Sequence, residues 1–105
     1  MKDEQKEEAM KPWETKSQFC LGQVLATPGA LAALEHAEDS LPALLRRHQR
    51  GDWGETCSED MQRNDDALRE GGRIFSVYIL HDGIVLWIIT EADRAATTAL
   101  LPDEY

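Results

Sequence analysis

The 105-residue chain is 42% hydrophobic and 30% charged, and twenty acidic against eleven basic side chains give a net charge of −9 at pH 7. This size and composition are typical of a single folded domain, and they argue against two cores and against a disordered chain. The negative charge repels phosphate backbones and therefore disfavours nonspecific binding to nucleic acid.

The sequence shows no membrane-spanning segment and no signal peptide. The longest apolar run, residues 84–89, is far shorter than the roughly 20 residues that cross a bilayer. The N-terminus also lacks the apolar region of a signal peptide, so we expect a cytoplasmic protein without a membrane segment. The chain has two cysteines and no C-x-x-C pair, which predicts two reduced thiols, one buried in a strand and one in a loop.

The expected elements run from a charged tail to an apolar C-terminal sheet. Residues 1–17 alternate Lys with Glu and Asp without an apolar stripe, which predicts a mobile tail before one domain over residues 18–105. Within that domain we predict a strand, three helices and three strands, over residues 18–26, 30–37, 43–50, 59–69, 74–80, 84–90 and 97–101. The order β-α-α-α-β-β-β predicts an α+β fold, with three helices packed on an antiparallel sheet of three or four strands.

Capping residues mark the ends of the helices. Thr27 before Pro28 is a start signal, and so is Ser40 at the head of the second helix. Gly51 is typical of a residue that stops a helix. Ser58 is the expected cap of the third helix, whose first turn is acidic, as the helix dipole favours.

The two apolar segments after Gly72 predict a β-hairpin. If the turn is a two-residue loop, Asp82-Gly83, the side chains alternate as follows. One face carries Phe75, Val77, Ile79, Leu86, Ile88 and Thr90, and the other carries Ser76, Tyr78, Leu80, Val85, Trp87 and Ile89. Both faces are largely apolar, so the second is covered by the tail, a helix or a partner, and a homodimer is one way to cover it.

Four polar residues supply the chemistry of a small metal-independent ribonuclease of toxin-like plan. Such an enzyme needs a base, an acid and a cation that stabilises a charged phosphorane. His48, Arg73, Tyr78 and Asp93 provide these residue types at helix and strand ends or on a strand face.

A purely structural interpretation covers the same side chains. Arg73 and Arg94 would pair with carboxylates such as Glu91, and Tyr78 would stack on Trp87 across the hairpin. His48 would then bond a carbonyl at a helix end. Both interpretations remain open at this point.

Two further groups are candidates for a binding surface. The first contains polar and aromatic residues around the sheet, namely Asp52, Trp53, Ser76, Trp87, Thr90 and Arg94. The second is the acidic third helix with Glu59, Asp60, Asp65 and Asp66, which could imitate a row of phosphates in a basic groove, or could simply be a solvated face.

Metal and cofactor binding lack a sequence signature. The possible metal ligands lie in different elements at irregular spacing, and they are Cys20, His36, His48, Cys57 and His81. The glycines form neither a P-loop nor a Gly-x-Gly-x-x-Gly turn, and no Gly-x-Ser-x-Gly elbow is present. We therefore expect no metal and no cofactor.

A string of short motifs extends over nearly all of the chain except the tail. It includes Leu21-Gly22, residues 26–31, His48, Gly51-Asp-Trp-Gly54, Asn64, Gly72-Arg-Ile74, Ser76-Val-Tyr78, residues 87–94, Thr97-Thr98 and residues 100–105. Together these motifs resemble a family of short bacterial proteins carried largely on plasmids and other mobile elements. Its members are often labelled plasmid-related protein or type I restriction endonuclease subunit M. The Asn-Pro-Pro-Tyr/Phe motif of a modification subunit does not occur in these 105 residues.

Two functional hypotheses follow. The first is a noncatalytic accessory protein of mobile-element origin that binds another protein and inhibits host defence. It rests on the resemblance, the acidic composition and the missing catalytic motifs. The alternative is the ribonuclease, which rests on fold-level analogy with toxin ribonucleases that place helices before an antiparallel sheet.

Overall fold

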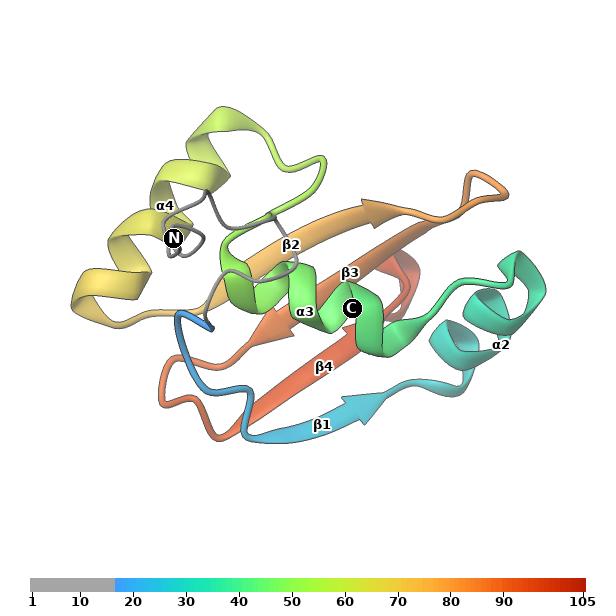
Figure 1. Ribbon diagram of the computed structural model, residues 1–105, viewed down its shortest axis with the longest axis horizontal. Coiled ribbons are helices and arrows are strands. Elements are labelled where there is room, and N and C mark those ends of the chain that lie inside the picture. Colours follow the sequence, from blue (N-terminus) through green and yellow to red (C-terminus); the bar gives the residue numbers. More distant parts are fainter. Residues whose placement is uncertain (1–16) are drawn as a thin grey trace, which may run out of the picture.

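The structure, a computed structural model, describes residues 17–105 and contains three helices and a four-stranded sheet (Figure 1). The strands are β1 (Gln23–Ala26), β2 (Ile74–Ile79), β3 (Val85–Thr90) and β4 (Ala96–Leu100). The helices are α2 (Pro28–Ala37), α3 (Leu41–Arg50) and α4 (Ser58–Glu70), and a 3-10 helix, η2 (Pro102–Glu104), follows β4. The α+β class and the order β-α-α-α-β-β-β are confirmed. The tail predicted over residues 1–17 lies, apart from Ser17, outside the described residues.

The strands are arranged in the order β1-β4-β3-β2, so β1 and β2 form the two edges. Strands β2, β3 and β4 are antiparallel neighbours, whereas β1 runs parallel to β4. The sheet is therefore mixed, which corrects the antiparallel sheet predicted from the sequence. Parallel strands need a long connection between them. The three helices that follow β1 supply it, so that β1 can pair parallel with β4.

The β2–β3 hairpin has a three-residue loop at residues 81–83. The Leu80 N–H donates to the Ile84 carbonyl oxygen at 2.8 Å, and the Gly83 N–H donates to the Leu80 carbonyl oxygen at 2.8 Å. Gly83 has φ +91°, a left-handed conformation that suits glycine. The predicted two-residue loop is wrong, and because a shift of one residue moves every side chain to the opposite face, the predicted faces of the hairpin are wrong too.

The correct register places the odd-numbered residues of β2 and β3 together. Phe75 lies opposite Ile89, Val77 opposite Trp87 and Ile79 opposite Val85. The even-numbered residues face the helices. This second face carries Ser76, Tyr78, Leu80, Leu86, Ile88 and Thr90.

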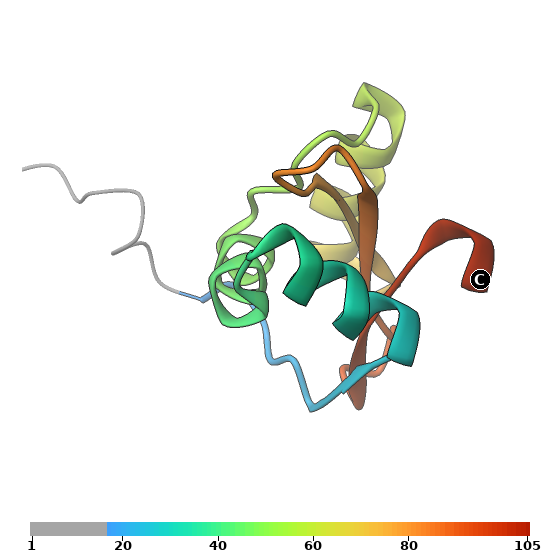
Figure 2. The same ribbon diagram turned by 90° about the vertical axis from the view of Figure 1, so that its right-hand side faces the viewer.

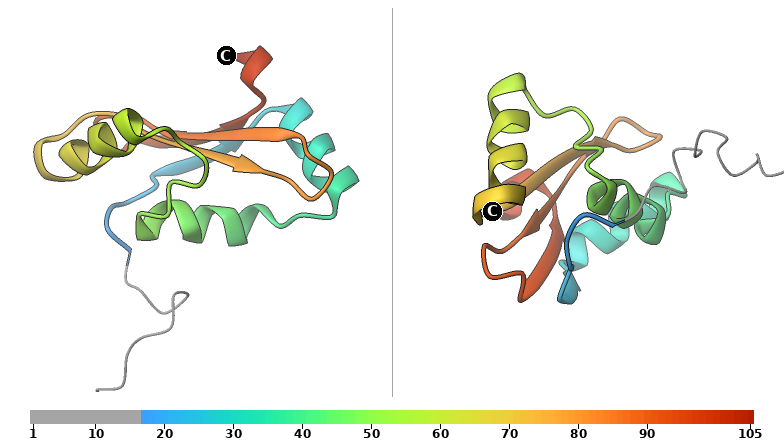
Figure 3. Two further views of the ribbon diagram at one scale, coloured as in Figure 1. Left: turned by 90° about the horizontal axis from the view of Figure 1, so that it is seen from above. Right: turned by 60° about the vertical axis from the view of Figure 1, so that its left-hand side comes forward.

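Helices α2 and α3 cover one face of the sheet, and α4 lies beside β2 (Figures 2 and 3). The main core forms between this helix layer and the sheet. It contains Ala30, Leu34, Ala37, Leu44, Tyr78, Leu80, Leu86, Ile88 and Ala99. A smaller cluster of Trp53, Ala67 and Ile74 joins α4 to the start of β2. Burial of these apolar side chains supplies the main stabilisation of the fold.

Most of the predicted helix ends are confirmed. The side chains of Thr27 and Ser40 accept hydrogen bonds from backbone N–H groups in the first turns of α2 and α3, and Gly51 ends α3 with φ +91°. The expected cap at Ser58 is wrong. Cys57 occupies the N-cap position without a side-chain hydrogen bond, and Ser58 is the first residue of α4.

The first strand is shorter than the predicted range 18–26. Gly22 has φ +67° and lies against the backbone carbonyl oxygens of Arg94 and Ala95, so the regular strand begins only at Gln23. Cys20 in the preceding segment is exposed, which corrects the expectation of a buried thiol.

The other face of the sheet carries no α-helix among residues 17–105, and only the short 3-10 helix η2 rises on this side (Figure 2). We call it the open face. It is formed by Gln23, Leu25, Phe75, Val77, Ile79, Val85, Trp87, Ile89, Ala96, Thr98 and Leu100. Within the same residues, no helix combines the length and the apolar character that crossing a membrane requires.

Candidate functional site

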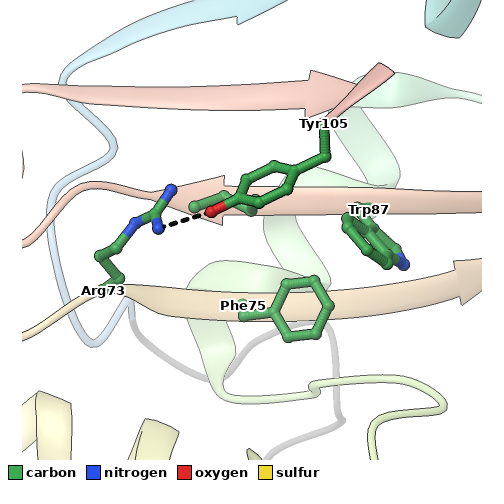
Figure 4. Close-up of a pocket in the computed structure, with 5 residues that line it drawn as sticks. Arg73, Phe75, Trp87 and Tyr105 are labelled. Atoms are coloured by element: carbon green, nitrogen blue, oxygen red, sulfur yellow. Dashed lines mark hydrogen bonds between the residues drawn. The ribbon is translucent and has the colours of Figure 1, made fainter. Parts of the chain in front are cut away.

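A pocket of about 260 Å³ lies on the open face. Five residues line it, namely Arg73, Phe75, Trp87, Ile89 and Tyr105 (Figure 4). The lining is almost entirely apolar, with the Arg73 guanidinium at one side. This pocket is the feature of the described residues best suited to hold a ligand or a partner side chain.

The hairpin register and the C-terminal turn bring the three aromatic rings together. Phe75 and Trp87 come from adjacent strands, and their ring centroids are 5.0 Å apart at an interplanar angle of 86°. Trp87 and Tyr105 follow at 5.8 Å and 67°. Both pairs are edge-to-face contacts, the arrangement that aromatic quadrupoles favour.

Glu104 fixes the turn that carries Tyr105. Its carboxylate accepts hydrogen bonds from the Thr27 hydroxyl at 2.5 Å and from the Leu101 N–H at 2.8 Å. The Thr27 bond is the main reason that the pKa of the Glu104 carboxyl lies below its usual value. The end of the chain is thereby joined to the start of α2, while Tyr105 itself stays 69% exposed.

Arg73 connects the pocket to the sheet edge. Its Nη1 donates to the Tyr105 hydroxyl at 2.8 Å, and its Nε lies 3.4 Å from a Glu91 carboxylate oxygen. The Tyr105 bond is the main cause that raises the pKa of Arg73. The Arg73–Glu91 pair expected from the sequence is confirmed. Because both side chains are about half exposed, the pair adds little stability.

A chain of polar groups lies on the opposite, helix-covered face. His48 is fully buried, with Nδ1 2.6 Å from Ser76 Oγ and Nε2 2.9 Å from Thr90 Oγ1. The chain continues from Thr90 to Thr97 Oγ1 at 2.7 Å, and Thr97 donates to the Leu21 carbonyl oxygen at 2.7 Å. The predicted bond from His48 to a helix-end carbonyl is wrong.

The bond from Thr97 to the Leu21 carbonyl oxygen fixes the direction of the Thr90–Thr97 and His48–Thr90 bonds. A carbonyl oxygen only accepts, so Thr97 uses its hydrogen on Leu21 and must accept from Thr90. Thr90 then accepts from Nε2–H of His48. Burial lowers the pKa of His48 to about 4, so the imidazole is neutral at pH 7 and its Nδ1 accepts from the Ser76 hydroxyl.

The four ribonuclease candidates do not line a common cavity in the described part of the chain. His48 and Tyr78 are buried on the helix-covered face, and the Tyr78 hydroxyl donates to the Asp52 carbonyl oxygen at 2.6 Å. Arg73 lines the pocket on the other face. Asp93 lies in the β3–β4 turn, where its carboxylate accepts from the backbone N–H two residues later at 3.0 Å.

Tyr78 also lacks the predicted contact with Trp87, because the two residues lie on opposite faces of the hairpin. Its ring instead lies under the Arg47 guanidinium, 4.6 Å from the ring centroid. Burial is the main cause that raises the pKa of the Tyr78 hydroxyl.

Asp52 and Trp53 stabilise the loop before α4. The Asp52 carboxylate accepts from Arg47 Nε at 2.7 Å, and this bond lowers its pKa. Trp53 is buried against His48 and Phe19, with ring centroids 6.0 and 6.5 Å away, and its indole Nε1 donates to Asp65 at 3.4 Å. Both residues thus have structural partners, as do the buried Ser76 and Thr90 described above.

Arg94 makes its described hydrogen bonds with carbonyl oxygens, so the predicted pairing with a carboxylate is wrong. Its partners belong to α4, to the segment before β2 and to its own turn. Arg94 therefore links α4, the segment before β2 and the β3–β4 turn, and it does not line the pocket.

The acidic helix α4 carries internal partners for much of its charge. Asp60 pairs with Arg63 at 3.3 Å and Asp66 with Arg69 at 2.6 Å, and Asp65 accepts from Trp53. Glu59 is exposed at the start of the helix. These i,i+3 pairs weaken the likeness to an uninterrupted row of phosphates.

Three pocket residues were missed in the sequence, namely Phe75, Ile89 and Tyr105. The wrong loop length separated Phe75 from Ile89 and Trp87. Alternation within each strand was a usable signal, but it needed the correct register. Tyr105 had no signal, because its position depends on how the C-terminal turn folds back over the sheet.

Among residues 17–105, no group of three or more His, Cys, Asp or Glu side chains is arranged to hold a metal ion. No protein-family model, curated protein or solved structure matches the chain. The resemblance to mobile-element proteins therefore stays a prediction based on the quoted motifs.

Proposed function

We propose that this chain is a noncatalytic interaction protein that binds another protein through the open face of its sheet. The observation that carries the proposal is the aromatic pocket on a face that no described helix covers. Its volume of about 260 Å³ is below the roughly 300–1,000 Å³ typical of small-molecule and cofactor pockets. A space of this size suits one apolar side chain of a partner, and such anchors dominate the energetics of protein interfaces.

The charge of the chain favours a basic partner. The Arg73–Glu91 pair places one charge of each sign beside the pocket, and the chain as a whole carries −9. A net charge of this size steers positively charged molecules toward the protein. We therefore expect a basic surface with a protruding aromatic or branched aliphatic side chain.

The placement of the polar residues supports a noncatalytic role. His48, the only fully buried histidine, contacts two hydroxyl groups and does not line the pocket. The pocket itself offers Arg73 and the Tyr105 hydroxyl, which bond to each other, and no general base. The motif resemblance to mobile-element proteins supports a host protein as partner, such as a defence component that the chain would inhibit.

The test uses a probe with the stated chemistry. The ¹⁵N-labelled full chain is titrated with the peptide acetyl-Lys-Lys-Trp-Lys-Lys-amide and with a control peptide in which Gly replaces Trp. We expect the tryptophan peptide to shift the resonances of Phe75, Trp87 and Tyr105, with an affinity on the order of 1 mM, since a single anchor gains only a few kcal/mol. Added salt weakens the binding.

Two variants make the test specific. Tyr105→Ala removes one wall of the pocket at an exposed position, and Met61→Ala changes an exposed apolar residue of α4 as the matched control. Tyr105→Ala should lose peptide binding and Met61→Ala should keep it. Shifts confined to α4, or equal shifts with the Gly peptide, would show that charge alone binds the peptide and that the pocket is not the site. If a second copy of the chain occupied the open face, the wild type would self-associate and Tyr105→Ala would abolish this self-association.

A further inference from the structure

The two edges of the sheet differ in how their backbone groups are satisfied. At the β2 edge, the Asn64 side chain donates to the Phe75 carbonyl oxygen at 2.8 Å and accepts from the Phe75 N–H at 3.0 Å. The Val77 N–H donates to the Trp53 carbonyl oxygen at 3.1 Å, and the Val77 carbonyl oxygen accepts from the Glu55 N–H at 2.7 Å. A side-chain amide and a loop therefore close this edge against other strands.

The β1 edge has no such cover among residues 17–105. The N–H groups of Gln23 and Thr27 donate to β4-side carbonyl oxygens at 2.9 and 3.0 Å, so odd-numbered residues bond inward. Because neighbouring residues of a strand alternate, the N–H and C=O groups of Val24 and Ala26 point away from the sheet. No described strand pairs with them. The strand has no charge, proline or bulge, which are the usual devices that protect an edge.

The same edge belongs to the longest uncharged stretch of the sequence, residues 17–34. Val24 and Leu25 are each 43% exposed. In a chain with a net charge of −9, most surfaces would place like charges opposite each other when two copies meet. The β1 edge reduces this repulsion, because the strand and its sequence neighbours over residues 17–34 carry no ionised side chain, and a neighbouring carboxylate, that of Glu104, is held by Thr27.

We propose that the β1 edge is a self-association site, at which β1 of a second copy pairs antiparallel about a two-fold axis at Leu25. In this register, the N–H and C=O groups of Val24 exchange hydrogen bonds with those of Ala26 in the other copy. The two Leu25 side chains face each other as a non-hydrogen-bonded pair, about 4.5 Å apart at Cα. The interface is isologous, as expected for a symmetric dimer.

The geometry also fixes how the two open faces are arranged. A two-fold axis between antiparallel edge strands is perpendicular to the sheet, so both helix layers lie on one side and both open faces on the other. Leu25 pairs with Thr98 and therefore belongs to the open face. The dimer would present two aromatic pockets side by side on one continuous eight-stranded sheet. This site is independent of the partner proposed for the pocket.

Sedimentation equilibrium of the full chain from about 10 µM to about 1 mM tests the proposal, because a short edge interface is expected to be weak. The average mass should rise above 11.8 kDa toward twice that value. Leu25→Lys and Leu25→Glu, each measured alone, should remain monomeric, because each places like charges at the two-fold axis. An equimolar mixture of the two variants should recover the dimer. Met61→Lys, a charge added at an exposed site on α4, should behave as the wild type.

Circular dichroism confirms that each variant is folded before its mass is interpreted. Added salt should strengthen the dimer, since it screens the repulsion between two negatively charged copies, whereas it weakens binding of the basic peptide. A monomeric wild type at about 1 mM, or Leu25→Lys that dimerises normally, overturns the proposal. Loss of the dimer in Trp87→Ala but not in Leu25→Lys would assign the contact to the open face instead. A protected Val24 amide in a monomer would mean that the edge is covered within the chain.

Discussion

The guanidinium of Arg94 donates a hydrogen bond from Nη2 to the Ala67 carbonyl oxygen at 3.0 Å, which ties the β3–β4 turn to the C-terminal end of α4. Its Nη1 donates to the Gly72 carbonyl oxygen at 2.7 Å and to two carbonyl oxygens of its own turn. One side chain thus joins the helix, the segment before β2 and the turn before β4. Arg94 holds this position with φ +62°, a conformation that costs free energy for a residue with a Cβ.

Arg94→Ala should lower the free energy of unfolding by about 2–3 kcal/mol, because several carbonyl groups lose a charged donor. Arg94→Gly separates the two effects, since it relieves the left-handed backbone but loses the same bonds, and it should remain less stable than the wild type. Urea denaturation measures both. Arg46→Ala, at an exposed position of α3, is the matched control and should change stability by less than about 0.5 kcal/mol.

The stability of the fold should depend on pH through His48. Its pKa is about 4 when folded against an ordinary value of 6.5, so the unfolded chain binds more protons between these pH values. Stability from this residue is therefore fully present above pH 6.5 and is lost as the pH falls toward 4, by about 3 kcal/mol in total.

His48→Gln cannot titrate, and the difference in unfolding free energy between wild type and variant should shrink as the pH falls from about 7 to about 4.5. Urea denaturation at several pH values measures this difference. A constant difference across the range, or an NMR titration of His48 near its ordinary pKa, would contradict the buried neutral imidazole.

Gly54 and Gly83 offer a matched pair of left-handed glycines. A Cβ at Gly54 would collide with the Val77 carbonyl oxygen and approach the Tyr78 ring, whereas a Cβ at Gly83 would meet no atom within 4 Å. Gly83→Ala should cost about 1–2 kcal/mol for the backbone conformation alone. Gly54→Ala should cost clearly more, because the loop must leave the β2 edge. Thermal unfolding of the two variants compares them, and equal losses would refute the close contact at Gly54.

Asn64 provides a test of the closed edge. Asn64→Leu leaves the Phe75 N–H and C=O without a described partner and should cost about 1–3 kcal/mol. Asn64→Asp keeps the acceptor and loses the donor, so an intermediate or pH-dependent loss is expected. A melting temperature within about 2 °C of the wild type for Asn64→Leu would mean that solvent replaces the amide without cost.

Local signals in the sequence were sufficient for the element order and for most helix ends. Thr27, Ser40 and Gly51 act through hydrogen bonds with residues a few positions away, so their roles can be read from short motifs. The hairpin shows the limit of this approach. Asp82-Gly83 suggested a two-residue loop, but His81 also belongs to the turn, and that one residue decided which side chains form the pocket.

The buried hydrogen-bond network around His48 could not be predicted from local signals, for a different reason. His48, Ser76, Thr90 and Thr97 come from α3 and three strands, and each looks like an ordinary polar residue in its own segment. Their burial is compensated only when all of them meet. The parallel pairing of β1 with β4 is equally nonlocal, since nothing within either segment specifies the other.

That pairing has a consequence for how the chain folds. The Thr97–Leu21 hydrogen bond beside it joins groups separated by 76 positions in the sequence, so β1 reaches β4 only by closing a loop of this length. Closing so large a loop carries an entropic cost that local helices and the hairpin do not bear, and contacts of long sequence separation slow folding. We therefore expect β1 to dock after the helices and the hairpin, and its edge to exchange amide hydrogens faster than the central strands β3 and β4.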